Sequence, residues 1–223
     1  MPEAPIDWSA FNRAARSRPP RELLRRTLGC LAIEGRPPGV AVDLGCGAGA
    51  DSLELLRRGW VVHAVDASAD SLDLLKAAAD PESSGRLHAH LQAYESFDVP
   101  ACDLIWAGYS LPFCNPQAWP VFWPRAVQAL RPGGRIAGDL FGTRHAFGSD
   151  GDVLLFTEAD ARALLAGLEV EAFDIEDGHR PSGGQITRWH AFGFAARKPA
   201  AGVASQSPRP HHPGTRPPSP TTS

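Results

Sequence analysis

Residues 40–66 read VAVDLGCGAGADSLELLRRGWVVHAVD. An apolar run that carries Asp43 is followed by three glycines spaced two residues apart, Gly45, Gly47 and Gly49. A helix-like segment comes next, and then a second apolar run that ends on another acid, Asp66. This order predicts a strand, a glycine turn, a helix and a second strand. Such a βαβ unit offers free backbone N–H groups and a helix N-terminus to a ligand, so the stretch predicts a nucleotide or nucleoside site.

The whole chain of 223 residues is long enough for one domain with a sizeable core. Its formal net charge of −3 gives no electrostatic reason to expect nucleic acid or an anionic membrane as a partner. No basic and apolar leader opens the sequence, and no apolar run reaches the roughly 20 residues of a membrane span. We therefore expect a cytoplasmic protein, monomeric or homodimeric, without a nucleic-acid or membrane partner.

The cysteines and histidines do not form a pattern that is typical of a metal site. Four cysteines are widely spaced and have no CxxC pair among them: Cys30, Cys46, Cys102 and Cys114. This spacing favours buried free thiols over disulfides or metal ligands. His88 and His90 share one face of a predicted strand, but the sequence offers no third ligand beside them. We expect no metal.

Strand-like and helix-like segments alternate along most of the chain. After the first two strands, further strands are expected at residues 86–91, 101–109, 135–142, 170–175 and 187–196. Residues 179–184 are few enough for a hairpin, so the last two strands should pair antiparallel. The predicted fold is α/β, a three-layer sandwich with a seven-stranded mostly parallel sheet, its last strand antiparallel and helices on both faces.

One predicted helix, at residues 118–130, contains Pro120 and Pro124. An interior proline removes a hydrogen bond and clashes with the preceding turn, at a cost of roughly 3 kcal/mol. We therefore expect the regular helix to start only at Pro124. The loop expected at residues 142–152 follows the next strand.

The chain divides into three parts. Residues 1–18 hold a short predicted helix with Trp8 and Phe11, which either covers an edge of the domain or forms a lid over a ligand site. Residues 19–198 form the main domain. Residues 199–223 are rich in Pro, Ser and Thr and have no aromatic residue, so they cannot bury enough apolar surface to offset their chain entropy. We expect this tail to be disordered.

Two ligands compete for the glycine turn. The stretch from Gly45 to Ala50 satisfies the relaxed dinucleotide fingerprint, and Asp66 lies near the expected ribose-binding distance, which fits NAD. However, a carboxylate at Asp43 would face a pyrophosphate at short range, whereas it suits a cation such as an ammonium. The Tyr-x-x-x-Lys set of many hydride-transfer enzymes is missing from the sequence. An NAD(P)-dependent oxidoreductase and a non-catalytic nucleoside-binding protein remain the alternatives.

The run VDLGCGAGADSLELLRRGWVVHAVDAS at residues 42–68 resembles the first motif and the following acid of seven-stranded, class I (Rossmann-like) S-adenosylmethionine-dependent methyltransferases. The LRPGGR turn at residues 130–135 and the antiparallel last strand also fit that family. Within it, the RWHAF segment at residues 188–192 is similar to bacterial small-molecule methyltransferases of the tellurite-resistance type. The resemblance covers roughly residues 19–198. It implies S-adenosyl-L-methionine as cofactor and in-line transfer of its methyl group to a small-molecule acceptor.

The resemblance also implies which residues bind the cofactor. They are Asp43, Gly45, Cys46, Gly47, Asp66, Ala67, Gln92, Ala93 and Trp106. Asp43 would lie near the methionine amino group, and Asp66 would accept hydrogen bonds from the ribose hydroxyls. Gln92 would meet the edge of the adenine, where many relatives have Asp, and its amide carbonyl can still accept from the exocyclic amine. The strand end from Trp106 to Tyr109 would close the pocket beneath the methionine portion.

The residues that act on the acceptor stay unknown at this stage. A sulfonium methyl carbon is already electrophilic, so positioning supplies much of the rate, and a general base is needed only for a protonated acceptor. The candidates are His145, whose unperturbed pKa lies near neutrality, and Tyr109. Further acceptor-side candidates are Trp8, Phe11, Arg13, Ser110, Phe113 and Arg144. Arg18 is either solvated or reaches the methionine carboxylate, and no NPPY-like element follows residues 101–109 to favour methylation of a DNA base.

Overall fold

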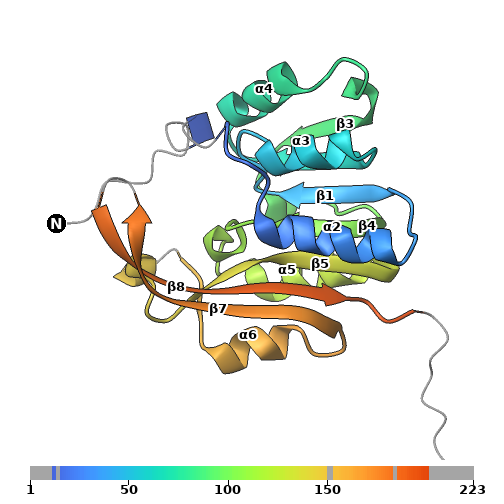
Figure 1. Cartoon of the computed structure of the whole chain (residues 1–223). Coiled ribbons are helices and arrows are strands. Elements are labelled where there is room, and N and C mark those ends of the chain that lie inside the picture. Colours follow the sequence, from blue (N-terminus) through green and yellow to red (C-terminus); the bar gives the residue numbers. More distant parts are fainter. Residues whose placement is uncertain (1–11, 14–15, 150–152, 183–184, 201–223) are drawn as a thin grey trace, which may run out of the picture.

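The structure is a computed structural model that describes residues 12–13, 16–149, 153–182 and 185–200 (Figure 1). One sheet holds eight strands: β1 (Val40–Leu44), β2 (Val61–Asp66), β3 (Leu87–Leu91), β4 (Cys102–Ala107), β5 (Leu130–Gly142), β6 (Leu155–Phe156), β7 (Glu169–Ser182) and β8 (Gln185–Arg197). Five α-helices accompany it in the described ranges: α2 (Glu22–Ile33), α3 (Ala50–Arg57), α4 (Ala69–Ala78), α5 (Trp119–Ala129) and α6 (Glu158–Leu164). None of these helices is long and apolar enough to cross a bilayer.

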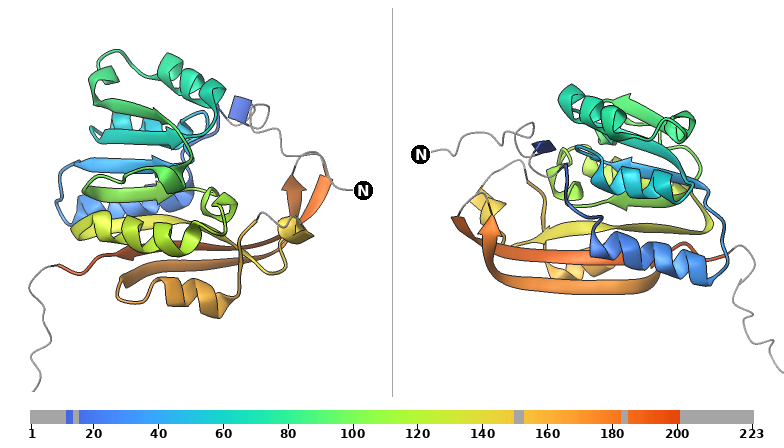
Figure 2. Two further views of the ribbon diagram at one scale, coloured as in Figure 1. Left: turned by 180° about the vertical axis from the view of Figure 1, so that it is seen from behind. Right: turned by 45° about the horizontal axis from the view of Figure 1, so that its top comes forward.

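The strand order is β3-β2-β1-β4-β5-β8-β7, with β6 paired to β5 outside this path. Strands β1 to β6 pair parallel, whereas β8 is antiparallel to both β5 and β7. This confirms the predicted α/β sandwich with a mostly parallel sheet. Figure 2 shows α5 on the face of the sheet opposite α2, so helices cover both faces.

Two parts of the strand prediction are wrong. The short strand β6 adds an eighth member to the sheet, and β7 continues well beyond residues 170–175, whereas β8 agrees with the predicted residues 187–196 to within two residues at each end. The two strands pair as far as Ser182 and Gln185, so residues 179–182 belong to β7 and not to the connection that was predicted at residues 179–184. The outer half of β7 carries charges such as Asp177 and Arg180, so the apolar alternation that marks a strand ends before β7 does.

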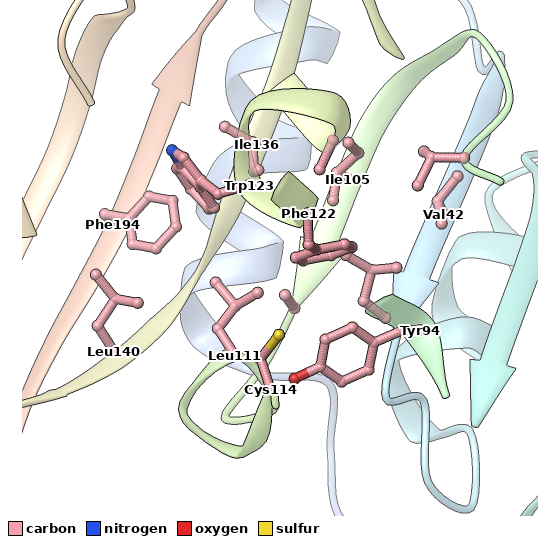
Figure 3. Packing of buried hydrophobic residues seen from close by; sticks show 14 of the residues in the cluster. Val42, Tyr94, Ile105, Leu111, Cys114, Phe122, Trp123, Ile136, Leu140 and Phe194 are labelled. Atoms are coloured by element: carbon pink, nitrogen blue, oxygen red, sulfur yellow. The ribbon is translucent and has the colours of Figure 1, made fainter. Parts of the chain in front are cut away.

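The core on the α5 face holds aromatic side chains from the helix and the strands (Figure 3). The rings of Trp123 and Phe194 meet edge to face with their centroids 5.9 Å apart, and the ring centroids of Phe122 and Tyr94 are 5.4 Å apart. Helix α5 begins at Trp119 and continues through Pro124, so the expected start at Pro124 is wrong. Burial of its large aromatic side chains offsets the hydrogen bond that Pro124 cannot donate.

Helix α2 lies on the other face and is fixed at both ends. At its carboxyl end, Glu34 accepts hydrogen bonds from the fully buried Arg135 of β5, at 2.6 and 3.1 Å. Arg135 also donates to Glu171 of β7, at 2.7 Å. At the other end, the backbone N–H of Arg21 donates to Asp51 of α3 at 3.0 Å. The first turn of α2 is thereby held at the edge of the sheet where the parallel strands end.

Candidate cofactor and acceptor site

The glycine turn between β1 and α3 depends on left-handed backbone and on close packing. Gly45 and Gly49 have φ of +69° and +84°, conformations that L side chains rarely adopt. A Cβ on Gly45 would lie 2.5 Å from the Cβ of Ser110, and one on Gly49 would lie 2.3 Å from Cδ1 of Leu75. The turn is therefore held tightly between α4 and the segment that follows β4.

The expectation that this turn offers free backbone N–H groups is wrong for four of its residues, one of which is Gly49, bonded to the carbonyl oxygen of Cys46 at 3.0 Å. Gly45 and Cys46 both donate to the carbonyl oxygen of Val65, at 2.8 and 3.1 Å. Gly47 donates to Oδ2 of Asp66 at 2.8 Å. A pyrophosphate at a glycine turn needs such donors for itself. The turn consequently favours a ligand that approaches the backbone without a large negative charge.

Asp66 and the predicted adenine-binding residues lie together where β2 and β3 end. Oδ1 of Asp66 accepts the N–H of Ser68 at 2.9 Å, and each carboxylate oxygen keeps a lone pair for a further donor. Gln92 donates its backbone N–H to the carbonyl oxygen of Asp66 at 3.1 Å. Ala67, Gln92 and Ala93 are exposed. An exposed row beside an acid suits a flat ring with hydroxyls next to it.

Two buried acids, Asp43 of β1 and Asp51 of α3, lie next to the turn. Ser52 donates its hydroxyl to Oδ2 of Asp43 at 2.5 Å. Burial raises the pKa of Asp43 to about 7, and the neighbouring charge of Asp51 adds to the shift. For Asp51, burial alone would raise the pKa, but hydrogen bonds and charges from Arg18 and Arg21 outweigh it and hold the pKa below its ordinary value. Asp51 is thus ionised, whereas Asp43 has no ion-pair partner in the described part of the chain.

Asp51 collects donors from three elements, although sequence reasoning assigned it no role. Arg18 binds it through both terminal nitrogens, at 3.0 and 2.6 Å. Trp106, fully buried at the end of β4, donates its indole N–H to Oδ2 at 3.0 Å. The guanidinium of Arg21 lies 3.5 Å away, and its buried Nε has no hydrogen-bond partner among the described residues. The sequence feature that could have identified Asp51 is its place in the first turn of the helix that follows the glycines.

Tyr109 is a strained residue just beyond the end of β4. Its φ is +56°, which costs a non-glycine residue roughly 1–2 kcal/mol. Its N–H donates to Oδ2 of Asp139 at 3.2 Å, and the guanidinium of Arg21 lies 4.7 Å from its ring centroid. Burial and the charge of Asp139 raise the pKa of Tyr109. Strain of this kind concentrates at functional sites.

His145 is not the near-neutral base that its residue type indicates. It is only 3% exposed, and its ring stacks on the ring of Phe141 with the two centroids 3.7 Å apart. Its Nδ1 accepts the N–H of Phe147 at 3.2 Å, while Nε2 has no partner within the described part of the chain. Burial, followed by the charge of Arg180, lowers the pKa of His145 to about 4. A neutral imidazole with this pKa is a weak proton acceptor.

The other acceptor-side candidates have structural partners or lie outside the described residues. Trp8 and Phe11 lie outside them, and Arg13 is exposed, 3.9 Å from Asp70. Ser110 donates to the carbonyl oxygen of Leu44 at 2.5 Å, and Arg144 pairs with Asp177 at 2.5 Å. Phe113 packs in the aromatic cluster around Phe141. No group of three His, Cys, Asp or Glu residues in the described ranges could hold a metal ion. The four cysteines are free thiols, three of them buried.

A cavity of about 220 Å³ opens beside Tyr109, between the start of α2 and strands β5, β8 and β7. Acids dominate its lining: Glu22, Asp139, Asp174 and Glu176, against the single cation Arg26. We call this cavity the acidic pocket. None of its acids was singled out from sequence, since Asp139 sits inside an apolar strand and the others read as ordinary surface charges.

Residues 41–134 match the model of the methyltransferase domain family, a span that includes Asp43, the glycine turn and Asp66. No curated protein matches the chain in sequence. Among solved structures, TehB from Haemophilus influenzae has a TM-score of 0.66 at 18% identity over 78% of this chain. The chain spans 62% of the length of TehB.

Two further structures of similar fold were solved with S-adenosylhomocysteine bound. The Burkholderia thailandensis 1,6-didemethyltoxoflavin-N1-methyltransferase is 24% identical, with 80% of this chain and 79% of that chain covered and a TM-score of 0.57. The magnesium protoporphyrin IX methyltransferase of Synechocystis PCC 6803 is 16% identical, with coverage of 85% and 94% and a TM-score of 0.59. Residues 41–134 thus resemble a methyltransferase domain, and the described chain shares its Rossmann-like fold with these S-adenosylmethionine-dependent methyltransferases.

Proposed function

We propose that the enzyme methylates a small-molecule acceptor and that the residues around Asp43 and Asp51 hold the methionine portion of the cofactor. One observation carries the cofactor assignment. Asp43 is a buried acid without an ion-pair partner among the described residues, and Nε of Arg21, although 3.5 Å from Oδ2 of Asp51, has no hydrogen-bond acceptor among them. The methionine portion carries an ammonium and a carboxylate, so one zwitterion supplies what both groups lack.

The remaining contacts follow from the positions of the predicted residues. Asp66 would bind the ribose hydroxyls with its free lone pairs, and Ala67, Gln92 and Ala93 would border the adenine. Gly45, Cys46 and Gly47 would allow close backbone approach, and Trp106 would support the methionine portion through Asp51. The domain would then comprise residues 19–198, with residues 1–18 as a lid and residues 199–223 as a disordered tail.

The lid assignment has support in one described residue of the N-terminal segment. Asn12 donates to Oγ of Ser71 at 2.8 Å, and its Oδ1 lies 2.8 Å from where a Cβ on Gly47 would be. Asn12 therefore lies directly against the glycine turn. A segment in this position would cover a bound cofactor and exclude water from it.

When bound, S-adenosylmethionine supplies an electrophilic methyl carbon on a sulfonium. The protein has to exclude water, hold the acceptor in line and receive a proton where the acceptor carries one. The acidic pocket adjoins Tyr109 at the end of β4, and its volume suits a small molecule. The net charge of −3 gives no attraction for nucleic acid. A cytoplasmic location and a monomeric or homodimeric state stay part of the proposal.

Isothermal titration calorimetry tests the cofactor site. We expect S-adenosylhomocysteine and S-adenosylmethionine to bind and NADH not to bind. Asp66→Ala should weaken S-adenosylhomocysteine by at least tenfold, whereas Asp73→Ala on the exposed side of α4 should not. Unchanged affinity in Asp66→Ala would refute the ribose assignment, and tighter binding of NADH would refute the proposal for the cofactor.

A further inference from the structure

The floor of the acidic pocket is a row of three residues on neighbouring strands. Asp139 of β5 pairs with Gly193 of β8, and Gly193 pairs with Asp174 of β7. Residues directly opposite one another point to the same face of a sheet, so the two carboxylates share one face with only a glycine between them. The next row on this face places Ala191 beside Glu176. The floor is therefore a shallow gap with small residues in the middle and acids on both sides.

Asp139 is the buried member of this set. It is 7% exposed, and Tyr109 donates its backbone N–H to Oδ2. No donor and no ion-pair partner within the described ranges reaches Oδ1, which would lie 3.5 Å from a Cβ on Gly193. A buried carboxylate is costly when no cation within the described ranges forms an ion pair with it, so Asp139 indicates a ligand that brings a positive charge.

The other acids of the pocket already have partners at the surface. Asp174 pairs with Arg26 at 2.7 Å, and Glu176 pairs with Arg180 at 3.2 Å. Glu22 pairs with Arg25. Exposed pairs of this kind are worth about 0–1 kcal/mol, so a cation entering the pocket can replace them at small cost. The residues that line the pocket itself include four acids and one arginine, so its lining favours a cation over an anion.

We infer that the acidic pocket binds the methyl acceptor, and that this acceptor is a small amine whose ammonium is held by Oδ1 of Asp139. The inference rests on the proposed function, because it identifies the pocket as the acceptor side of the same site. It disfavours carboxylates and metalloid oxyanions as acceptors.

Asp139 can also receive the proton that an ammonium has to lose before it becomes a nucleophile. The N–H bond breaks, its electron pair stays on nitrogen as a lone pair, and the proton moves to Oδ1 of Asp139. The charged groups that face Asp139 are Arg21, Asp51 and Arg180, and Asp174 lies across Gly193. Burial raises the pKa of Asp139 to about 7, with Asp51 adding to the shift and the arginines opposing it.

Calorimetry with three probes of similar shape tests the inference: benzylamine, benzyl alcohol and benzoate, each added to protein saturated with S-adenosylhomocysteine. We expect benzylamine to bind best and benzoate not to bind. Asp139→Asn should weaken benzylamine by at least tenfold and leave S-adenosylhomocysteine unchanged, whereas Asp73→Asn should change neither. Benzoate binding as well as benzylamine, or unchanged benzylamine affinity in Asp139→Asn, overturns the inference.

A second variant tests the shape of the pocket without changing its charge. A Cβ on Gly193 makes only ordinary contacts, the nearest at 3.5 and 3.6 Å, so Gly193→Ala should fold. It fills the gap between the carboxylates and should weaken benzylamine severalfold, whereas Gly178→Ala, which meets nothing within 4 Å, should not.

If methylamine, benzylamine and histamine all fail to bind while S-adenosylhomocysteine binds, the inference fails alone. If S-adenosylhomocysteine fails to bind, the proposed function fails, and the amine titrations without it still test the pocket.

Discussion

Replacing Asp51 with alanine should destabilise the whole edge of the sheet where the cofactor site lies. The carboxylate receives both terminal nitrogens of Arg18, the backbone N–H of Arg21 and the indole N–H of Trp106. Its removal leaves the indole N–H unpaired in the core and takes away the anion that faces two guanidinium groups.

The size of the effect follows from the burial of these partners. Removing one member of a buried ion pair costs about 3–5 kcal/mol. The Arg18 side chain is 25% exposed and can regain water, so we expect the lower end, about 3 kcal/mol. For a chain of this size, 1 kcal/mol corresponds to roughly 2–4 °C, which gives a fall in Tm of about 6–12 °C.

Urea unfolding followed by circular dichroism measures this change, and Asp73→Ala serves as the control. Asp73 is 76% exposed and lies 3.6 Å from Lys76, so its loss should cost less than about 0.5 kcal/mol. A loss below 1 kcal/mol in Asp51→Ala would contradict the reasoning, because it would mean that the four hydrogen bonds contribute no net stability.

Three further predictions concern the glycine turn, the buried acids and the thiols. Gly49→Ala should lower stability by about 2–4 kcal/mol, since it adds strain at φ +84° to a clash with Leu75, whereas Gly35→Ala, with nothing within 4 Å, should lose only about 1–2 kcal/mol; equal losses would argue against the clash. Asp43→Asn should stabilise the protein by about 2 kcal/mol more at pH 8 than at pH 5.5. The pKa of Asp43 in the folded protein, about 7, lies above its ordinary value, so the wild type loses stability as the pH rises from 5.5 to that pKa. Over these roughly 1.5 pH units the loss is 1.36 kcal/mol per unit, and a pH-independent difference between the two proteins would refute the raised pKa. Ellman's reagent should modify only Cys30 rapidly in the folded protein and four thiols after unfolding, and rapid reaction of more than one thiol in the folded state would contradict the burial of the other three.

The sequence predicted the features that local patterns specify. The glycine turn and its two strands were found because spacing and apolar runs are local, and the antiparallel end of the sheet followed from a short connection. The outer half of β7 was missed because charged pairs such as Arg144 and Asp177 stabilise it in place of an apolar face. The start of α5 was wrong because aromatic packing outweighs the cost of Pro124.

The burial of individual side chains at the site could not be predicted from the sequence. His145 looked like a titratable loop residue, yet the aromatic ring of Phe141 covers it and keeps it neutral. Asp139 looked like an ordinary polar residue within a strand, yet the structure leaves one of its oxygens without a partner in the described residues. Both differences depend in part on contacts between residues far apart in the chain, Trp189 with His145 and Tyr109 with Asp139, which no local pattern encodes.

Asp51 links the two halves of the site electrostatically. Its charge helps to raise the pKa of Asp43 on the cofactor side and of Asp139 on the acceptor side. A sulfonium cofactor and an ammonium acceptor would bring like charges close together, and repulsion between them has to be offset inside the protein. Asp43 and Asp139, which form no ion pair with any described residue, provide that compensation together with the ionised Asp51. Neutralising Asp51 should therefore lower the pKa of both neighbours and weaken the two ligands together, whereas neutralising Asp139 should weaken the amine alone.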